Sequence, residues 1–350
     1  MTRRPRPRRR PVPRRAPPGP LRTVGGVLFA LAAFALVAGG WVLWTYRGPG
    51  PQAREGEATT VVLARGSGLG GIADNLARAG VIRSKAVFMA AARLSGAAGA
   101  LKAGEYEFRS GASMAGVLGD IRAGRVVRHL VTVPEGWTSE MAWEAVLRQP
   151  VLVGEAPVPA EGALLPDTYQ VQRGDSRAAV LQRMAKAQDD LMAELWPRRQ
   201  RGLPFETPEE ALTLASIVEK ETGVAAERPR IAAVFVNRLR QGMRLESDPT
   251  IIYGVSRGRP LGRGILASEL AARTPYNTYQ IDGLPPTPIA NPGRAAIEAV
   301  LNPPSTSELF FVADGSGGHV FASTFDEHRR NVARWREVER ARAAQAGAGR

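Results

Sequence analysis

The sequence predicts an α+β protein with one membrane-spanning helix near its N-terminus. The first observation is an uncharged apolar run of 23 residues, Val24 to Tyr46. The second is a set of short strand-like runs, each followed by a turn and an amphipathic run. The third is a longer C-terminal region in which helical periodicity mixes with short β-branched and aromatic runs. We therefore expect a basic tail (1–23), a transmembrane helix (24–46), a linker (47–59), a small αβ module (60–153) and a larger mixed α+β domain (160–342).

The apolar run is long enough to cross a bilayer. As a helix it extends about 35 Å, and the hydrocarbon core is roughly 30 Å thick. Trp41, Trp44 and Tyr46 lie at its C-terminal end, where an aromatic belt belongs. Residues 1–23 hold nine arginines and no acid, so we expect a cytoplasmic N-terminus and an extracytoplasmic (periplasmic) remainder at the inner membrane. A cleaved signal peptide is the alternative, but its apolar core would be shorter and a small-x-small cleavage site would follow.

The composition excludes several classes of site. The formal net charge of +14 falls to +5 without the nine tail arginines. An arginine-rich tail beside a membrane span is typical of a topology signal. We therefore expect no nucleic-acid partner. The chain has no cysteine, which rules out disulfides, thiolate nucleophiles and cysteine-ligated zinc. Three histidines occur without an HExxH or paired spacing, so we expect no metal and no cofactor.

The small module contains a weak internal repeat. Strand-like runs at 59–64, 104–109 and 130–134 each precede a glycine-containing turn with a capping hydroxyl and a short helix. The first turn, residues 66–71, formally matches the dinucleotide-binding fingerprint GxGxxG. That fingerprint also requires an acidic residue about 20 positions later, and residues 86–92 read AVFMAAA. The glycines are better explained as turn formers.

The candidate catalytic residues lie at the end of an apolar helix. Thr207 and Glu210 are spaced as a capping box, and the helical pattern continues to about Gly223. Glu219 and Glu221 therefore fall in its last turn, beside apolar residues and at the negative end of the helix dipole. Both effects raise the pKa of a carboxyl group and favour a general acid. The two residues lie about 200° apart around the helix, so only one can enter a given cleft, and the residues alone do not decide which.

Polar and aromatic residues downstream supply candidate substrate contacts. A second helix is expected over about 227–241, and Asp248, just before Pro249, is expected to cap a short helix. The proline- and aromatic-rich segments 274–279 and 283–293 are typical of rigid cleft walls. The residues that we expect to contact substrate are Asn237, Asp248, Thr250, Tyr253, Tyr276, Asn277 and Tyr279.

A β-hairpin is expected near the C-terminus. Its strands, residues 309–313 and 319–322, flank the glycine-rich turn at 314–318. His319 and His328 lie close to this hairpin, and we expect both to be structural because neither has a partner at a spacing typical of catalysis.

Six motifs in this region resemble, in order, those of the YceG-like, or MltG, endolytic murein transglycosylases. The resemblance covers about residues 160–330 and implies that the first Glu of the Glu-Lys-Glu run, Glu219, is the catalytic acid. The preceding module loosely resembles the LysM-like module of the same family, and LysM modules bind glycan rich in N-acetylglucosamine. The motifs are LASIVEKET (214–222), ER (227–228), VFVNRL with GMRLESDPTIIYG (234–254), TPYNTY (274–279), GLPPTPIANPG (283–293) and FVADGSGGHVF (311–321).

The resemblance also implies a reaction. It is cleavage of the β-1,4 bond from N-acetylmuramic acid to N-acetylglucosamine inside nascent glycan strands, by a lyase step that leaves a 1,6-anhydro end. Peptidoglycan strands would be the substrate, peptidoglycan synthases are candidate partners, and the cut would end chain elongation. Two alternatives stay open: a muramidase that uses water, and a peptidoglycan-binding scaffold without activity.

Overall fold

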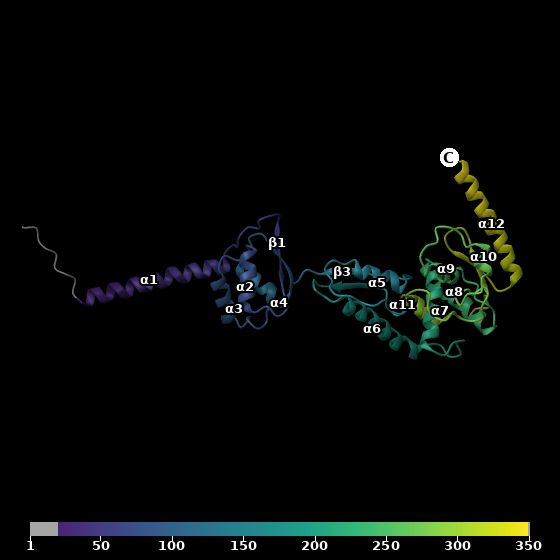
Figure 1. The fold of residues 1–350 in the computed structure, drawn as a ribbon, viewed down its shortest axis with the longest axis horizontal. Helices are drawn as coiled ribbons and strands as arrows, with labels where there is room; N and C mark the ends of the chain where they lie inside the picture. Colours follow the sequence, from purple (N-terminus) through teal and green to yellow (C-terminus); the bar gives the residue numbers. More distant parts are fainter. Residues whose placement is uncertain (1–19, 349–350) are drawn as a thin grey trace, which may run out of the picture. The chain divides into compact units, whose positions relative to one another are not determined.

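The computed structural model describes residues 20–348, with side chains described for residues 24–342. The chain divides into two compact units, residues 1–127 and residues 128–350, which we describe separately (Figure 1). Most of the predicted basic tail lies outside the described residues. Helices alternate with small antiparallel strand pairs within the described part, so the predicted α+β class is confirmed.

The N-terminal helix α1 (Pro20–Arg47) contains the predicted span. From Val24 to Arg47 it is long and apolar enough to cross a membrane. Its side chains are widely exposed: Phe29 is 77% and Leu36 is 78% exposed. A continuous exposed apolar surface of this kind is typical of a helix that faces lipid.

The segment after α1 is fastened to unit 1 and does not behave as a free linker. The amide of Gly50 donates to the carbonyl of Gly111 at 2.9 Å, and the amide of Gly111 donates to the carbonyl of Pro51 at 2.9 Å. Arg83 Nη2 donates to the carbonyl of Gly50 at 3.2 Å. A Cβ atom on Gly50 would lie 2.0 Å from the carbonyl oxygen of Ala112, so this close approach requires glycine.

Unit 1 is built on one antiparallel strand pair. Apolar side chains from both strands and from three helices form its buried core. Because the strands are antiparallel, they do not form the parallel βαβ unit of a dinucleotide-binding fold, and Gly66 adopts a turn conformation with φ of +81°. The elements are β1 (Ala58–Leu63), α2 (Leu69–Arg78), α3 (Lys85–Leu94), β2 (Gly104–Arg109) and α4 (Met114–Ala123).

The division of the chain falls before the third strand and not at the predicted joint, residues 151–160. The third strand–turn–helix therefore belongs to unit 2, because its strand pairs with a strand that begins 36 residues after Thr132. Val151 and Leu152, 4% and 3% exposed, pack into the same core as this strand. The elements of this part are β3 (His129–Thr132), α5 (Ser139–Leu147), β4 (Thr168–Val171) and α6 (Arg177–Leu195).

The rest of unit 2 is mainly helical. The capping box predicted from Thr207 and Glu210 is present at the start of α7. Helices α7, α8 and α11 lie together around the largest buried core (Figure 1). The elements are η1 (Trp196–Arg198), α7 (Pro208–Glu221), η2 (Ala225–Glu227), α8 (Arg228–Arg240), α9 (Asp248–Ser256), α10 (Ala267–Ala271) and α11 (Arg294–Leu301).

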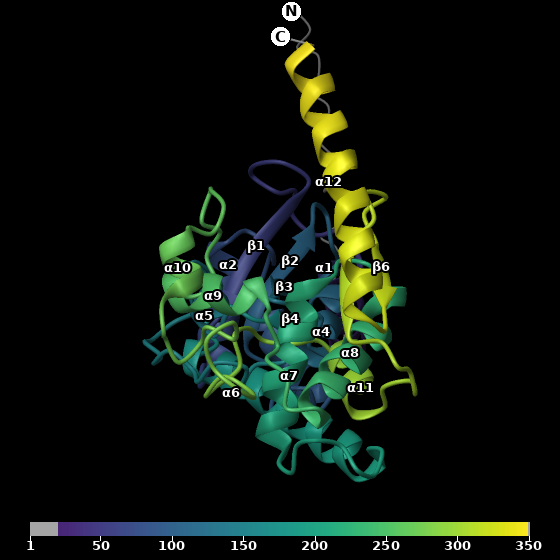
Figure 2. The same ribbon diagram turned by 90° about the vertical axis from the view of Figure 1, so that its right-hand side faces the viewer.

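The predicted C-terminal hairpin is present and carries the last helix. β5 (Phe310–Ala313) pairs antiparallel with β6 (His319–Ala322), and the turn between them uses Gly315 at a φ of +88°. Helix α12 (Phe325–Ala348) then lies beside this hairpin (Figure 2). Its first turn brings His328 to the same cavity as Glu221, the last residue of α7.

Candidate functional site

Helix α7 ends with two carboxyl groups that have different surroundings. Residues 213–218 are buried on every side of the helix, so its last turn emerges from the main core. Glu219 and Glu221 therefore leave the core in different directions, as expected for positions about 200° apart. Their contacts decide what each can do.

Glu219 is hydrogen-bonded to Arg228 and to the backbone before α11. Its side chain is only 4% exposed, and its Oε1 accepts a hydrogen bond from Arg228 Nη2 at 3.3 Å. Its Oε2 accepts a hydrogen bond from the amide of Gly293, the residue that precedes α11, at 3.0 Å. Burial raises the pKa of Glu219, while the Gly293 amide and Arg228 oppose that rise. Glu219 thus connects the end of α7 to the start of α8 and to the start of α11, where a carboxylate is favourable.

Glu221 lines a cavity of about 410 Å³. Its Oε1 accepts a hydrogen bond from the hydroxyl of Ser247. Burial raises the pKa of Glu221 to about 7; the Ser247 hydroxyl opposes this rise, and the charge of Asp248 adds to it. A carboxyl group with this pKa is about half protonated at neutral pH, so it can donate a proton and later accept one.

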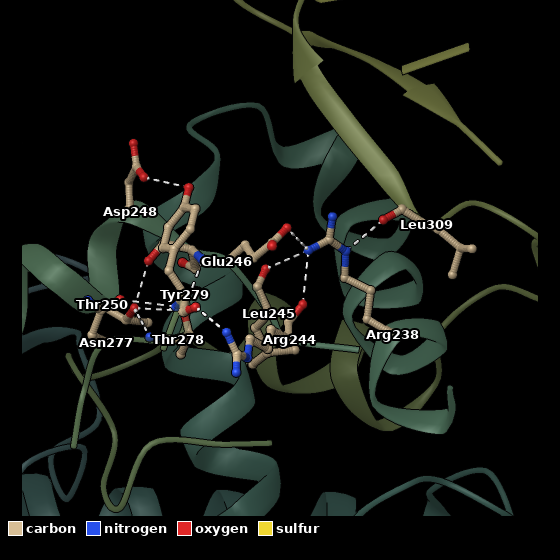
Figure 3. Close-up of polar contacts among 11 residues, drawn as sticks. Arg238, Arg244, Leu245, Glu246, Asp248, Thr250, Asn277, Thr278, Tyr279 and Leu309 are labelled. Atoms are coloured by element: carbon tan, nitrogen blue, oxygen red, sulfur yellow. Dashed lines mark hydrogen bonds and ion pairs between the residues drawn. The ribbon is translucent and has the colours of Figure 1, made fainter. Parts of the chain in front are cut away.

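Asp248 and Tyr279 lie in the same cavity as Glu221. The hydroxyl of Tyr279 donates to Asp248 Oδ1 at 2.8 Å (Figure 3). Burial and the neighbouring Asp248 carboxylate raise the pKa of Tyr279. Asp248 is the first residue of α9 and does not cap it as expected; Ser247 occupies the cap position. The side chain of Asp248 is therefore available to the cavity.

Arg238 forms one wall of the cavity and is a residue that the sequence analysis missed. It is 7% exposed and organises the segment between α8 and α9. Its Nη1 donates to the carbonyls of Arg244 and Leu245 at 3.0 and 3.1 Å (Figure 3). The same atom donates to Glu246 Oε2 at 3.0 Å, and Nε donates to the carbonyl of Leu309 at 2.7 Å. Glu246 has a φ of +53°, a left-handed conformation that these bonds hold next to the cavity.

The two histidines near the hairpin have different positions. His319 Nδ1 lies 2.8 Å from Glu227 Oε2, which fits the structural role that we expected. His328 lines the Glu221 cavity, and its ring stacks on Phe310 with centroids 5.0 Å apart. Burial and the nearby Arg238 lower the pKa of His328, so the imidazole is neutral at neutral pH. Its place in the cavity could not be read from the sequence, because it depends on how α12 packs.

Several predicted substrate contacts hold the loops around the cavity instead of lining it. Asn237 donates from Nδ2 to the carbonyls of Thr306 and Glu308 at 2.9 and 3.0 Å. Asn277, 1% exposed, donates to the carbonyls of Leu270 and Ala272 at 3.0 and 2.7 Å. These amides are satisfied within the protein, so they position the backbone and do not reach the cavity.

Thr250, Tyr253 and Tyr276 are also engaged within the protein. Thr250 is fully buried and donates to the carbonyl of Ser247 at 2.6 Å. Tyr253, 4% exposed, donates to Glu161 Oε2 at 3.1 Å, and its ring meets that of Tyr276 edge-on at 4.9 Å. Of the seven predicted contacts, Asp248 and Tyr279 are therefore the two that the structure brings to the same cavity as Glu221.

The chain matches known proteins over most of its length. The sequence profile of the YceG-like family matches residues 61–334. An endolytic murein transglycosylase of Bacillus subtilis (strain 168) is 35% identical over 172 residues, which cover 49% of this chain and 47% of that protein. One from Streptococcus pneumoniae serotype 2 (strain D39) is 30% identical over 324 residues, which cover 78% of this chain and 58% of that protein.

A solved structure is also similar. The crystal structure of a YceG-like protein from Listeria monocytogenes aligns with a TM-score of 0.49 and 28% identity, covering 79% of this chain and 99% of that one. This chain spans about half of the Bacillus relative and less than two thirds of the streptococcal one. Because the family profile extends from β1 into α12, the chain belongs to the YceG-like family.

Proposed function

We propose that this chain is a membrane-anchored endolytic lytic transglycosylase of peptidoglycan, with Glu221 as its general acid. One observation carries the proposal: Glu221 is a carboxyl group with a pKa of about 7 in a cavity large enough for a sugar ring. The relatives named endolytic murein transglycosylases support the reaction class. The resemblance of the sequence implied Glu219, but the bonds from Arg228 and Gly293 to Glu219 favour Glu221.

In the proposed first step, protonated Glu221 donates its proton to the oxygen that joins C1 of N-acetylmuramic acid to C4 of N-acetylglucosamine. The bond from C1 to that oxygen breaks, and N-acetylglucosamine leaves with a free hydroxyl. The Glu221 carboxylate then accepts the proton of the C6 hydroxyl of the muramic residue, whose oxygen bonds to C1 and closes the 1,6-anhydro ring. The proton returns to Glu221 and no water is consumed, so the second carboxylate of a hydrolytic pair is not required.

Asp248 supports this chemistry in two ways. Its negative charge raises the pKa of Glu221 and so keeps part of the acid protonated. The same charge lines the cavity in which C1 becomes positive in the transition state, and a fixed charge there lowers the barrier. The hydrogen bond from Tyr279 fixes the orientation of Asp248.

The cellular setting is part of the proposal. Helix α1 would anchor the chain in the cytoplasmic membrane with its N-terminus inside, and both units would lie outside. Unit 1 would serve as a LysM-like module that contacts glycan. Anchoring would keep the Glu221 cavity near strands that leave membrane-bound synthases, so that each cut ends a growing strand. A chain without α1 that keeps full function in cells would contradict this arrangement.

The test uses the full-length protein in detergent with uncrosslinked glycan strands and mass spectrometry of the products. We expect anhydro-ended fragments from the wild type and from Glu219→Gln, and none from Glu221→Gln. The matched control is Glu298→Gln, an exposed residue of α11, which should cut like the wild type.

Each other result points to a specific alternative. If Glu219→Gln loses cleavage and Glu221→Gln keeps it, with both variants folded, the general acid is Glu219 and not Glu221. Products with reducing ends, heavier by one water, would indicate a muramidase. A Glu221→Gln chain that restores a deletion strain as well as the wild type would indicate a scaffold.

A further inference from the structure

An apolar groove of about 700 Å³ lies between α1 and α3 within unit 1. Its walls are exposed: Leu94, the last residue of α3, is 90% exposed, and Leu43 of α1 is 54% exposed. The groove continues the exposed apolar surface of α1, and a large exposed apolar surface marks a place that something else covers. The lining residues that matter here are Ala38, Val42 and Leu43 from α1, and Ala90 and Leu94 from α3.

The length of α1 indicates that the groove lies inside the bilayer. If the whole groove stood in water, only residues 24–37 would be left to span the membrane, about 21 Å of helix for a core of roughly 30 Å. If the span runs to Leu43, it has about 30 Å, and Trp44 and Tyr46 fall at the headgroup level. The α1 wall of the groove, from Ala38 to Leu43, then lies in the outer leaflet, and the wall formed by α3 lies beside it.

The C-terminal end of α3 is closed by hydrogen bonds within the chain. The last carbonyls of a helix have no partner within the helix, and lipid cannot supply one. Here the carbonyls of residues 91–93 accept hydrogen bonds from the chain itself. Ser95 Oγ donates to the carbonyl of Ala91 at 2.7 Å, and the amide of Ala97 donates to the carbonyl of Ala92 at 2.8 Å. The amide of Gly96 donates to the carbonyl of Arg93 at 3.1 Å.

The attachment of α1 holds the two walls together. Gly50 is bonded to Gly111 and to Arg83 of unit 1, so α1 and α3 belong to one framework. The guanidinium of Arg83 lies over the ring of Trp44, with 5.2 Å to its centroid. A basic group stacked on a tryptophan at the end of a span suits the headgroup layer.

We propose that unit 1 is seated in the membrane, with the C-terminal half of α3 in the outer leaflet and lipid acyl chains filling the groove. Leu94 is the deepest contact of unit 1 outside α1. This inference rests on the proposed anchoring through α1 and goes beyond it, because an anchored protein can also carry its outer domain clear of the bilayer.

The test exploits the absence of cysteine from the chain, which makes single-cysteine labelling direct. Full-length Leu94→Cys, Leu36→Cys and Val62→Cys are labelled with one fluorophore and reconstituted into vesicles of phosphatidylcholine and phosphatidylglycerol. Leu36 is an exposed position within α1, and Val62 is an exposed position on β1, outside the groove. Quenching by iodide in the water and by a brominated acyl chain in the lipid is measured at each position.

We expect the Leu94 label to behave like the Leu36 label, with several-fold weaker iodide quenching than at Val62 and strong quenching by the brominated lipid. If iodide quenches the Leu94 label as strongly as the Val62 label while the Leu36 label is quenched only by the brominated lipid, this inference is wrong. The proposed anchoring through α1 would still hold. Shielding of Leu94 from both quenchers would overturn it in favour of a protein, such as a second copy, in the groove. Iodide access at Leu36 would overturn the anchor and this inference together.

Discussion

Replacing Glu221 by Gln is expected to stabilise the folded protein above neutral pH. Burial raises the pKa of Glu221 from 4.5 to about 7, so the folded state resists ionisation that the unfolded state undergoes freely. The unfolded state therefore binds fewer protons between about pH 4.5 and 7, and the free energy of unfolding falls with rising pH across that window. Above pH 7 the full loss is about 3 kcal/mol, which corresponds to the displacement of the pKa. The amide of the substituted glutamine is neutral at every pH and avoids this loss.

The assay is thermal unfolding of the full-length protein at pH 5 and pH 8. The wild type should lose stability between these pH values, and Glu221→Gln should lose less and melt higher than the wild type at pH 8 by roughly 5–10 °C. Glu219→Gln should melt lower than the wild type, because it leaves Arg228, 12% exposed, with a weakened partner. The exposed control Glu298→Gln should change little. A Glu221→Gln variant that is no more stable than the wild type at pH 8 would refute the burial of this charge.

Four further predictions concern the cavity. Ser247→Ala removes a donor to the ionised carboxylate and should move the alkaline fall of kcat/KM, which follows the pKa of Glu221, up by about one pH unit. Asp248→Asn removes a like charge and should move the same fall to lower pH; equal profiles for both variants would contradict the assignment. Tyr279→Phe should lower kcat/KM about tenfold with an unchanged melting temperature, since it removes one hydrogen bond to a carboxylate. Arg238→Met should destabilise unit 2 by about 1–3 kcal/mol, measured in chemical denaturation, because three carbonyls lose their donor.

Local patterns in the sequence predicted the elements that local forces determine. The apolar run of α1 needs only its own length to be recognised. The start of α7 follows from the spacing of Thr207 and Glu210, whose bonds connect neighbouring residues. The hairpin at 309–322 follows from its glycine-rich turn.

Contacts between distant residues decided the rest. The third strand–turn–helix has the same local pattern as the first two, but its strand pairs with Thr168–Val171 of unit 2. Periodicity could not separate Glu219 from Glu221, because residues 213–218 are buried on all faces of the helix. Their environments are set by donors far along the chain, at Gly293 for Glu219 and at Ser247 for Glu221. Nothing in the spacing of the Glu-Lys-Glu run encodes these partners.

The hydrogen bonds of Gly50 within unit 1 would let a bilayer act mechanically on the protein if α1 spans it as proposed. A span that is too long for its bilayer tilts until its apolar length fits the hydrocarbon thickness. Since α1 has no free joint at Gly50, any tilt of α1 must turn unit 1 with it. If α1 spans the membrane as proposed, membrane thickness would set the orientation of unit 1 through lipid composition, without any ligand.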